Sequence, residues 1–365
     1  MLKTLYVTNV PSPYRVSFLE LLGRRTDLTV LYERKTANDR DNRWWTAEDT
    51  HHYQEVCLKG LPIRADSSLS RGIVSHLHLH AYDRILLCNY SSPSVMLAIR
   101  YLRRLGIPFG IICDGILPKP EEKDGWKLRL KRSLVSAADF WLSSGPVTTE
   151  ELVRIGAVRD RIFRYPLSSV SESDLREAAR CDRASAKRSL GLEGKTVLLY
   201  VGRFIPCKGL DVLIPAFAQL KSSHPELALL MVGGTAGELT SLGVESLPQD
   251  VHCVGFQRPD ALRRFYAAGD LLVFPTRGDS WGLVVNEAFA YGLPVVTTDR
   301  CVAGLTLVQD GVTGAIVPPD DPVALCGGIL RGLGCVNVPE IRAVAAEYTI
   351  EAMAGRTAEI LESLS

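Results

Sequence analysis

Two acidic and two basic residues in the second half of the sequence have the types and spacing to bind a phosphorylated, hydroxyl-rich ligand. Asp279 and Glu287 have seven residues between them in F-P-T-R-G-D-S-W-G-L-V-V-N-E-A-F-A-Y-G, and Arg203 and Lys208 lie in V-G-R-F-I-P-C-K-G. Lysine and arginine bind phosphate oxygens, and carboxylates accept hydrogen bonds from hydroxyls. A nucleotide sugar carries both a diphosphate and hydroxyls, so this set of residues predicts a site for that class of ligand.

The stretch around Asp279 also predicts an anion site made by the backbone. An apolar strand at residues 271–274 ends at Pro275, and Gly278 and Gly282 allow sharp turns before a helix begins near Leu283. The first amides of a helix have no partner within it and lie at the positive end of its dipole. The amides of residues 282–284, with Ser280 beside them, are therefore expected to bind phosphate, and Glu287 lies one helical turn further on.

A plainer interpretation of the same residues exists. Asp279 or Ser280 could serve only as the N-cap of the helix, and Glu287 could be a solvated helix residue. Arg203 and Lys208 could be ordinary exposed residues of a loop.

The elements of the second half are expected to bring these residues together. Strands are predicted at residues 196–201, 228–232, 251–254, 271–274 and 294–297, with helices at 210–220 and 260–267 and the helix that carries Glu287. Alternation of strands and helices predicts a parallel, Rossmann-like sheet. Because ligands of such sheets bind at the carboxyl ends of the strands, Arg203 and Lys208 are expected level with Gly282.

The first half shows the same alternation. Strands are predicted at residues 2–7, 28–32, 84–88, 109–113 and 138–143, and helices at 16–22 and 95–105. The loops at 9–15 and 114–118 then lie at the working edge of a second Rossmann-like sheet.

We therefore expect an α/β protein of two such domains facing a central cleft. Residues 1–167 form the N-terminal domain, 168–194 a hinge, and 195–345 the C-terminal domain, while 346–365 form a helix that packs back toward the N-terminal domain.

Composition limits the classes of function. The chain of 365 residues is 46% hydrophobic and 23% charged, and no apolar run approaches the ~18 residues of a spanning helix. Nine cysteines without a Cys-x-x-Cys pair indicate neither a disulfide framework nor a zinc knuckle. The N-terminus leads directly into a strand pattern without a signal-peptide cleavage site, so a cytoplasmic location is expected.

Charge is distributed unevenly along the chain. Residues 1–165 contain 25 Lys+Arg and 18 Asp+Glu, a net charge of +7, whereas residues 166–365 contain 17 and 23, a net charge of −6. A basic first half indicates an acidic partner, such as an anionic membrane surface or a phosphorylated acceptor. Nucleic acid is not expected, because no basic run alternates with aromatic residues.

The most basic helix predicted in the first half spans residues 124–136. Lys127, Lys131 and Arg132 surround an apolar stripe of Trp126, Leu130 and Leu134. Packing of that stripe into its own domain is favoured over contact with an anionic membrane at the inner face, although both fit the pattern.

Three histidines, His76, His78 and His80, alternate with other residues. On a strand they would share one face and could bind metal, whereas a helix at residues 69–81 would scatter them. We expect the helix and no metal site, because no carboxylate or cysteine ligand is near.

Together, three segments resemble the C-terminal domain of family-four retaining glycosyltransferases with the GT-B fold. They are G-R-F-I-P-C-K-G-L-D-V-L-I-P-A-F, G-D-S-W-G-L-V-V-N-E-A-F-A-Y-G-L-P-V-V-T-T and D-G-V-T-G-A-I-V-P-P. The resemblance covers most of residues 190–365, and the first half is similar only in layout. It implies that Arg203 and Lys208 bind the donor diphosphate with help from Gly202 and the amides of Gly282, Leu283 and Val284.

The resemblance further implies that Glu287 binds the ribose hydroxyls and that Phe256 lies near the base. Asp279 replaces the first glutamate of the family and would contact the transferred sugar. Because Trp281 is next to this position in the sequence, we also expect it to pack on the sugar ring. Asp114 stands where many relatives have a histidine that faces the sugar.

The first loop also departs from the family pattern. Pro11-Ser12-Pro13-Tyr14-Arg15 replaces the usual Gly-Gly, which makes Ser12, Tyr14 and Arg15 candidates for contact with the acceptor.

The function implied is a retaining glycosyltransferase that needs no metal or other cofactor. It would move a sugar from a nucleotide diphosphate donor, a UDP-sugar, to a hydroxyl acceptor such as a lipid-linked glycan in polysaccharide biosynthesis. Two alternatives remain open: a UDP-sugar 2-epimerase, which shares the fold, and a non-catalytic nucleotide-sugar-binding partner subunit, which the altered first acid would suit.

Overall fold

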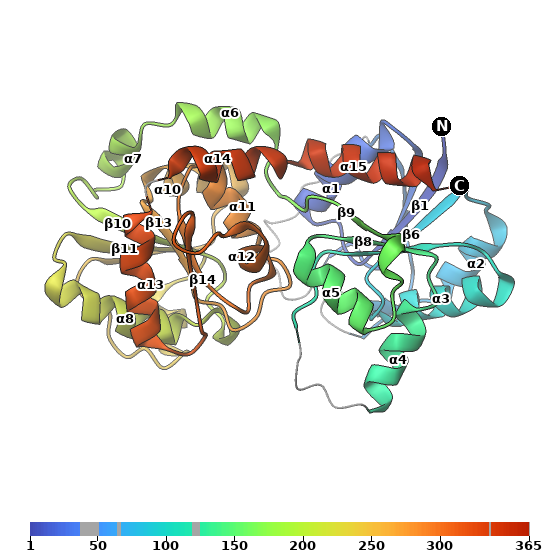
Figure 1. Ribbon diagram of the computed structural model, residues 1–365, viewed down its shortest axis with the longest axis horizontal. Coiled ribbons are helices and arrows are strands. Elements are labelled where there is room, and N and C mark those ends of the chain that lie inside the picture. The colour runs from blue at the N-terminus through green and yellow to red at the C-terminus, as the bar shows by residue number, and fades with distance from the viewer. Residues whose placement is uncertain (37–50, 64–66, 119–124, 336, 365) are drawn as a thin grey trace. The chain divides into compact units, whose positions relative to one another are not determined.

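The computed structural model describes residues 1–36, 51–63, 67–118, 125–335 and 337–364 (Figure 1). The chain divides into two compact units. Unit 1 comprises Met1–Leu167 and Ile350–Ser365, and unit 2 comprises Ser168–Thr349.

Unit 1 contains a parallel sheet in the order β3-β2-β1-β6-β7-β8-β9. The strands are β1 (Lys3–Thr8), β2 (Asp27–Tyr32), β3 (Gln54–Cys57), β6 (Arg84–Cys88), β7 (Gly110–Cys113), β8 (Phe140–Ser143) and β9 (Ile162–Arg164). A short antiparallel pair joins β4 (Leu61–Pro62) to β5 (Ser68–Leu69). The order of the strands reverses between β1 and β6, so the loops after these strands flank the reversal.

Helices cover both faces of this sheet (Figure 1). They are α1 (Pro13–Gly23), α2 (Gly72–Leu79), α3 (Pro93–Leu105), α4 (Trp126–Val135), α5 (Pro146–Arg154) and α15 (Ile350–Ser363), with a 3₁₀ turn at Arg159–Arg161. Alternate residues of β1 face opposite sides, as strand geometry requires: Leu5 and Val7 enter a core with α2 and α3, whereas Tyr6 packs edge-on against Phe18 of α1. The sheet is thus buried on both faces.

Unit 2 contains a parallel sheet in the order β12-β11-β10-β13-β14-β15. The strands are β10 (Thr196–Val201), β11 (Leu227–Val232), β12 (Val251–Val254), β13 (Leu271–Phe274), β14 (Val295–Thr298) and β15 (Gly314–Val317). This order is that of the doubly wound nucleotide-binding fold, and it reverses between β10 and β13. The loops that follow these two strands therefore lie at the place where such sheets bind ligands.

The helices of unit 2 also form two layers, with α8 and α13 on one face of the sheet and α10 and α11 on the other (Figure 1). They are α6 (Glu172–Arg180), α7 (Arg183–Ser189), α8 (Leu210–Ser223), α9 (Ala236–Thr240), α10 (Pro259–Ala268), α11 (Leu283–Ala290), α12 (Val302–Leu307), α13 (Pro322–Gly334) and α14 (Val338–Glu347), with a 3₁₀ turn at Pro206–Lys208. All six residues of β11 are buried, as expected for a strand covered on both faces.

The expected hinge at residues 168–194 is wrong. This segment belongs to unit 2, where it forms α6 and α7 and where Arg263 of α10 binds Asp174 at 3.0 Å and also pairs with Glu177. The polar, alanine-rich composition that suggested a linker is that of surface helices: α6 buries only Ala178 and begins with a capping box at Ser171.

The last helix belongs to unit 1. α15 packs against α1 and buries Ile350, Met353, Ile360 and Leu361. Arg84 at the start of β6 donates from Nε to the Leu361 carbonyl at 2.8 Å. Residues 346–349, which were grouped with this helix, lie in unit 2 instead.

The basic helix α4 packs on its own unit through Leu130 and Leu134, as predicted, but not through Trp126. Leu128, Leu134 and Val135 are buried, whereas Trp126 is 71% exposed, with the Lys127 ammonium 5.8 Å from its ring centre. Trp126 is the first residue of the helix. The predicted stripe, with apolar residues spaced by four, therefore included one residue too many at its N-terminal end. Asp124, its expected first residue, lies outside the described residues.

His76 and His78 lie on α2, and His80 follows it, as expected for the helical alternative. His76 contacts Tyr82 at 2.6 Å, and His78 contacts Tyr101 at 3.1 Å. Within the described ranges, no group of three or more His, Cys, Asp or Glu residues could hold a metal ion.

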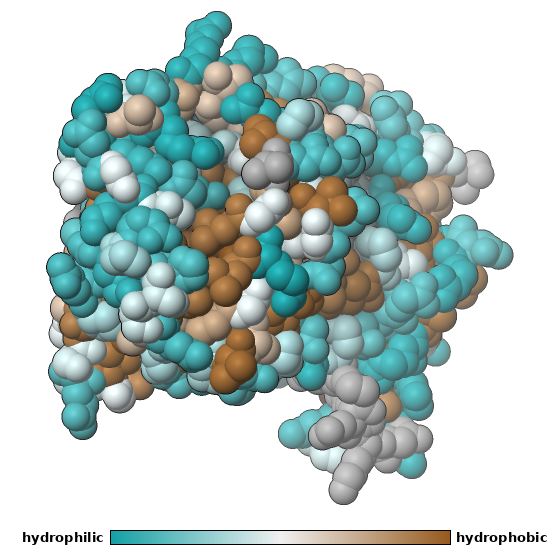
Figure 2. Space-filling view, turned by 60° about the vertical axis from the view of Figure 1, so that its left-hand side comes forward, coloured by the Kyte–Doolittle hydropathy of each residue, from teal (hydrophilic) through white to brown (hydrophobic). Residues whose placement is uncertain are grey.

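Hydrophilic residues cover most of the face drawn in Figure 2, and hydrophobic residues show there in patches. No single helix in the described part of the chain is long and apolar enough to span a bilayer. α13 and α14 pass that test of length and composition only as a pair bent by 97°.

Candidate functional site

The candidate site of unit 2 is built from the loops that follow β10 and β13. Gly209 has a φ of +66°, and a Cβ atom there would lie 2.2 Å from the Pro275 carbonyl oxygen. A side chain would therefore push the two loops apart. Glycine at this position lets the turn that carries Lys208 lie directly against the loop after β13.

Hydrogen bonds hold the same two loops together. The Cys207 carbonyl accepts from the Arg277 amide at 2.8 Å and from the Thr276 hydroxyl at 3.0 Å. The Arg277 guanidinium binds Asp211 of α8 through both terminal nitrogens, at 2.9 and 2.7 Å, and Asp320 at 2.6 Å. Both carboxylates raise the pKa of Arg277, against a smaller effect of burial. Arg277 thus braces the site without being free to bind a ligand.

Lys208 and Asp279, predicted to share this edge, form an ion pair. The Lys208 Nζ lies 2.6 Å from Asp279 Oδ2 and 4.8 Å from the centre of the Phe274 ring. Their side chains are 13% and 21% exposed, so the pair is accessible from solvent. An ammonium has three donors, and Asp279 uses one of them, so Lys208 keeps hydrogen-bonding capacity for an anion.

The interpretation of Asp279 or Ser280 as an N-cap is wrong. The N-cap of α11 is Gly282, with a φ of +98°. Asp279 Oδ1 instead accepts from the Trp281 amide at 3.2 Å, and Ser280 is exposed. A Cβ on Gly282 would lie 2.7 Å from the Cys301 sulfur, so glycine is required for this approach.

α11 begins at Leu283, as predicted, and Leu283 and Val284 are its first two residues. As amides of the first helical turn, they have no hydrogen-bond acceptor within the helix, and they follow the Asp279 loop directly in the chain. A phosphate could be bound there by backbone donors while Lys208 supplies charge.

Trp281 is a core residue and not a wall of the site. It is 3% exposed, its indole Nε1 donates to Asn286 Oδ1 at 2.8 Å, and its ring stacks on Tyr348 with centres 6.4 Å apart. The expectation that it packs on a sugar ring is therefore wrong in this conformation.

Glu287 lies on α11, half-buried and hydrogen-bonded through both oxygens. Oε1 accepts from the Ser169 hydroxyl at 2.9 Å and Oε2 from the Tyr266 hydroxyl at 2.6 Å. Burial raises the pKa of Glu287 above its ordinary value, and the two hydrogen bonds oppose that shift. The interpretation of Glu287 as a solvated helix residue is thus wrong, and the carboxylate is held in a fixed orientation.

Three further candidates lie at the same edge of the sheet. Arg203 and Gly202 follow β10 directly; the Arg203 carbonyl accepts from the buried Tyr200 hydroxyl at 2.9 Å, and Gly202 has a φ of +153°. Phe256 follows β12, two strands away from β10, and is half-buried. A ligand bound near Phe256 and α11 would extend across the edge of the sheet.

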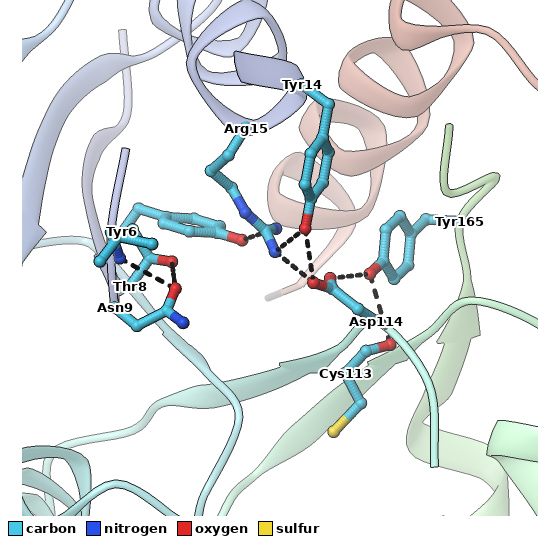
Figure 3. Close-up of polar contacts among 9 residues, drawn as sticks. Tyr6, Thr8, Asn9, Tyr14, Arg15, Cys113, Asp114 and Tyr165 are labelled. Carbon is cyan, nitrogen blue, oxygen red and sulfur yellow. Dashed lines mark hydrogen bonds and ion pairs between the residues drawn. The ribbon is translucent and has the colours of Figure 1, made fainter. Parts of the chain in front are cut away.

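In unit 1, a second polar cluster joins the candidates from the first loop to Asp114 (Figure 3). Asp114 follows β7, and its Oδ2 accepts from the Tyr14 hydroxyl at 3.1 Å and forms an ion pair with Arg15. The Tyr165 hydroxyl donates to Oδ1 at 2.9 Å, and Arg15 also donates to the Tyr6 hydroxyl at 2.7 Å.

The surroundings of this cluster favour a charged Arg15 and a protonated Tyr14. Burial is the largest single effect and lowers the pKa of Arg15, but Asp114 together with Cys88, Tyr14 and Tyr6 outweighs it, so this pKa lies well above its ordinary value. Burial also raises the pKa of Tyr14, so its hydroxyl stays protonated and donates. Arg15 is buried with its charge balanced by Asp114, whose side chain is 25% exposed.

Ser12 is the remaining candidate of that loop. It occupies the N-cap position of α1, but its side chain makes no capping bond, and it is 6% exposed. The structure thus brings Tyr14 and Arg15 to Asp114, and it leaves Ser12 at the start of the same helix.

Sequence reasoning missed Ser169, Tyr266, Arg277 and Tyr165. Ser169, Tyr266 and Tyr165 each bind a predicted residue on a different element, and Arg277 braces the loop that carries Asp279. Only the fold joins these elements. Tyr266 lies in a predicted helix, but nothing in its spacing points to Glu287.

The second half of the chain is similar to a known family. Residues 195–334 match the family model "Glycosyl transferases group 1". The match lies within unit 2 and coincides with the segments that carry the resemblance, which is thereby confirmed.

Curated relatives include two proteins named D-inositol 3-phosphate glycosyltransferase. The one from Nocardia farcinica (strain IFM 10152) is 35% identical over 219 residues, covering 56% of this chain and 46% of the relative. The one from Acidothermus cellulolyticus (strain ATCC 43068 / DSM 8971 / 11B) is 33% identical over 235 residues, covering 60% and 50%. The chain thus spans about half the length of the curated relatives it matches.

Solved structures show the same fold. Anabaena Alr3699/HepE in complex with UDP has a TM-score of 0.74 at 20% identity, with 100% of both chains covered. WaaG, a glycosyltransferase involved in lipopolysaccharide biosynthesis, has a TM-score of 0.69 at 18% identity, covering 99% of this chain and 100% of WaaG. The predicted fold class, α/β of the GT-B type with two Rossmann-like units, is confirmed.

Proposed function

We propose that this protein is a retaining glycosyltransferase that transfers a sugar from a UDP-sugar to a hydroxyl acceptor. The observation that carries the proposal is the meeting of Lys208, Asp279 and the first residues of α11 at the reversal of strand order between β10 and β13. The family of residues 195–334 and the UDP complex of the structurally similar HepE support it.

In the proposed reaction, the site of unit 2 binds the donor in three parts. Lys208, Arg203 and the amides at the start of α11 bind the diphosphate, and they stabilise it most as negative charge grows on the leaving group. Glu287 accepts hydrogen bonds from the ribose hydroxyls. The acceptor hydroxyl attacks from the face of the leaving diphosphate, which takes up its proton, and the protein contributes positioning and charge stabilisation.

The negative charge of Asp279 lies close to the proposed diphosphate site, where it would repel a bound anion. A phosphate oxygen would displace or share the Lys208 ammonium, and the Asp279 carboxylate would then turn to a hydroxyl of the transferred sugar. Donor binding would thus release the acid for its contact with the sugar.

Nucleoside diphosphate binding tests the assignment. Arg203→Ala and Lys208→Ala should each weaken UDP binding in calorimetry, because each removes a charge-assisted contact worth about 1.5–3 kcal/mol. Arg331→Ala, which removes an exposed cation from α13 of the same unit, is the matched control. Unchanged affinity in both site variants would overturn the assignment.

A separate experiment tests whether the donor nucleotide is UDP. In a thermal-shift screen of nucleotide sugars, a donor at 100 times its dissociation constant should stabilise the protein by about 2.7 kcal/mol. UDP-sugars should give the largest shifts, and a larger shift from a GDP- or ADP-sugar would replace UDP in the proposal.

Charge stabilisation by Arg203 and Lys208 leads us to propose that no metal or other cofactor is needed. Activity should therefore survive excess EDTA. Asp39-Arg40-Asp41 has the spacing of metal-binding carboxylates and lies outside the described residues. The activity in EDTA therefore also tests whether these two carboxylates bind a metal that the reaction needs. Loss of activity on chelation that Mg²⁺ or Mn²⁺ restores would contradict the proposal.

For the acceptor, we propose a lipid-linked glycan of a surface polysaccharide, glycosylated in the cytoplasm at the inner membrane face. The basic charge of residues 1–165 and the exposed Trp126 beside Lys127 on α4 support it. The curated relatives are named for inositol 3-phosphate, so transfer to that small acceptor, without any lipid, is the outcome that would overturn it.

A further inference from the structure

The contacts of Glu287 come from three separate segments of unit 2. Glu287 lies on α11, Tyr266 lies on α10, and Ser169 precedes α6. Tyr266 binds Oε2 at 2.6 Å, and Ser169 binds Oε1 at 2.9 Å. One donor at each oxygen sets the plane and the direction of the carboxylate.

We propose that Tyr266 and Ser169 are positioning residues that hold Glu287 ready to accept both ribose hydroxyls of the donor. Each carboxylate oxygen has two lone-pair sites, so each has one left after the contact inside the protein. The two remaining sites match the two neighbouring hydroxyls of a ribose. This inference rests on the proposed function and extends it to residues that do not touch the donor.

Tyr266 is itself held in place. It is 3% exposed, and its ring stacks on Tyr291 with centres 5.6 Å apart. Burial raises the pKa of Tyr266 well above its ordinary value, so the phenol remains protonated and can only donate to Glu287. Its contact therefore favours the ionised carboxylate.

The two donors also determine the pH range in which Glu287 can act. Burial raises the pKa of Glu287, whereas the hydrogen bonds from Tyr266 and Ser169 lower it. Without either donor the pKa rises further, and a larger fraction of Glu287 is protonated as the pH falls. A protonated carboxyl group loses an acceptor site for ribose, so donor affinity in such a variant should fall at a higher pH than in the wild type.

Tyr266→Phe and Ser169→Ala test this inference, with Tyr291→Phe as the matched control. Tyr291→Phe removes a phenol hydroxyl from the ring stacked on Tyr266, and Glu287 keeps both of its partners. UDP binding would be measured by calorimetry at pH 6 and pH 8. Inorganic pyrophosphate, which lacks ribose, would be measured in competition with UDP, and thermal unfolding would be recorded for every variant.

We expect Tyr266→Phe to weaken UDP binding about tenfold at pH 6, the loss of one hydrogen bond to a charged group, and less at pH 8. Ser169→Ala should show the same dependence on pH with a smaller change. Pyrophosphate affinity should stay at the wild-type value, and Tyr291→Phe should bind both ligands like the wild type.

Three results would overturn the inference alone, while the wild type still binds UDP. They are variants that bind UDP normally, variants whose loss is the same at both pH values, and variants that lose UDP and pyrophosphate equally. A wild-type protein that binds no UDP would overturn the proposed function and this inference with it.

Discussion

At the scale of single residues, the candidate site of unit 2 and the polar cluster of unit 1 are each built from charges that already have partners. Lys208 is paired with Asp279, Glu287 with two hydroxyls, and Arg15 with Asp114. The sequence predicted that Lys208 and Asp279 lie at the same edge, because loops at the carboxyl ends of neighbouring strands share it, but it did not predict their ion pair. It predicted neither Ser169 nor Tyr266, because hydrogen bonds between distant elements leave no periodic pattern in a sequence.

The Lys208–Asp279 pair leads to a prediction about turnover. Asp279→Asn keeps an oxygen for the Trp281 amide but removes the negative charge next to Lys208. UDP should then bind as tightly as to the wild type or a few-fold more tightly, because a partly exposed ion pair contributes less than about 1 kcal/mol and its loss frees the ammonium. Sugar transfer should fall at least tenfold, because the proposed contact with the transferred sugar loses its charge.

Steady-state kinetics and calorimetry with UDP separate these two effects. Asp279→Ala should show the same division, together with a loss of the hydrogen bond to the Trp281 amide. Full turnover in both variants would show that Asp279 only orders the loop and does not contact the sugar.

At the scale of elements, the site depends on how closely two loops approach each other. The sequence predicted the strands on both sides, β10 and β13, with boundaries that agree with the structure. It could not predict the bracing of the loop after β13 by Arg277 on Asp211 and Asp320, because these three residues are far apart in the chain. Helix spacing identified Leu130 and Leu134, which pack on the core of unit 1, but it did not predict that Trp126 at the start of α4 is exposed.

Gly209→Ala tests the approach of the loops, and Gly191→Ala is its matched control. Both glycines have positive φ, +66° and +68°, but a Cβ on Gly209 would lie 2.2 Å from the Pro275 oxygen, while one on Gly191 would have nothing within 4 Å. Both changes should cost about 1 kcal/mol of stability through backbone strain. Gly209→Ala should cost more than that and should weaken UDP binding as well.

Urea unfolding and calorimetry measure both quantities. Equal losses of stability in the two variants, with UDP affinity unchanged in both, would show that the contact between the loops does not shape the site.

At the scale of the whole molecule, the chain contributes both of its ends to unit 1, because α15 packs on α1 while residues 168–349 form unit 2. Composition suggested a linker after residue 167, and the boundary falls there, but the segment that follows is folded. A polar, alanine-rich sequence describes a surface helix as well as a hinge, and only contacts such as Arg263 with Asp174 distinguish the two.

The basic charge of unit 1 leads to a prediction about membranes. Lys127, Lys131 and Arg132 lie on α4 near the exposed Trp126. Replacing all three by glutamine should weaken binding to vesicles that contain anionic lipid by about 1 kcal/mol per charge at low salt. The same triple change at Arg100, Arg103 and Arg104 of α3 removes equal charge from the same unit and should have a smaller effect.

Co-sedimentation at two salt concentrations is the measurement. Wild-type binding that depends on neither lipid composition nor salt would leave α4 as a surface helix without a membrane partner.

The most direct test of the central claim is an experimental structure of the protein with UDP bound. We expect the diphosphate at the amides of Gly282, Leu283 and Val284 and near Lys208 and Arg203, with the ribose hydroxyls on Glu287. Electron density for UDP at another edge of the sheet, or a ribose that does not contact Glu287, would contradict it.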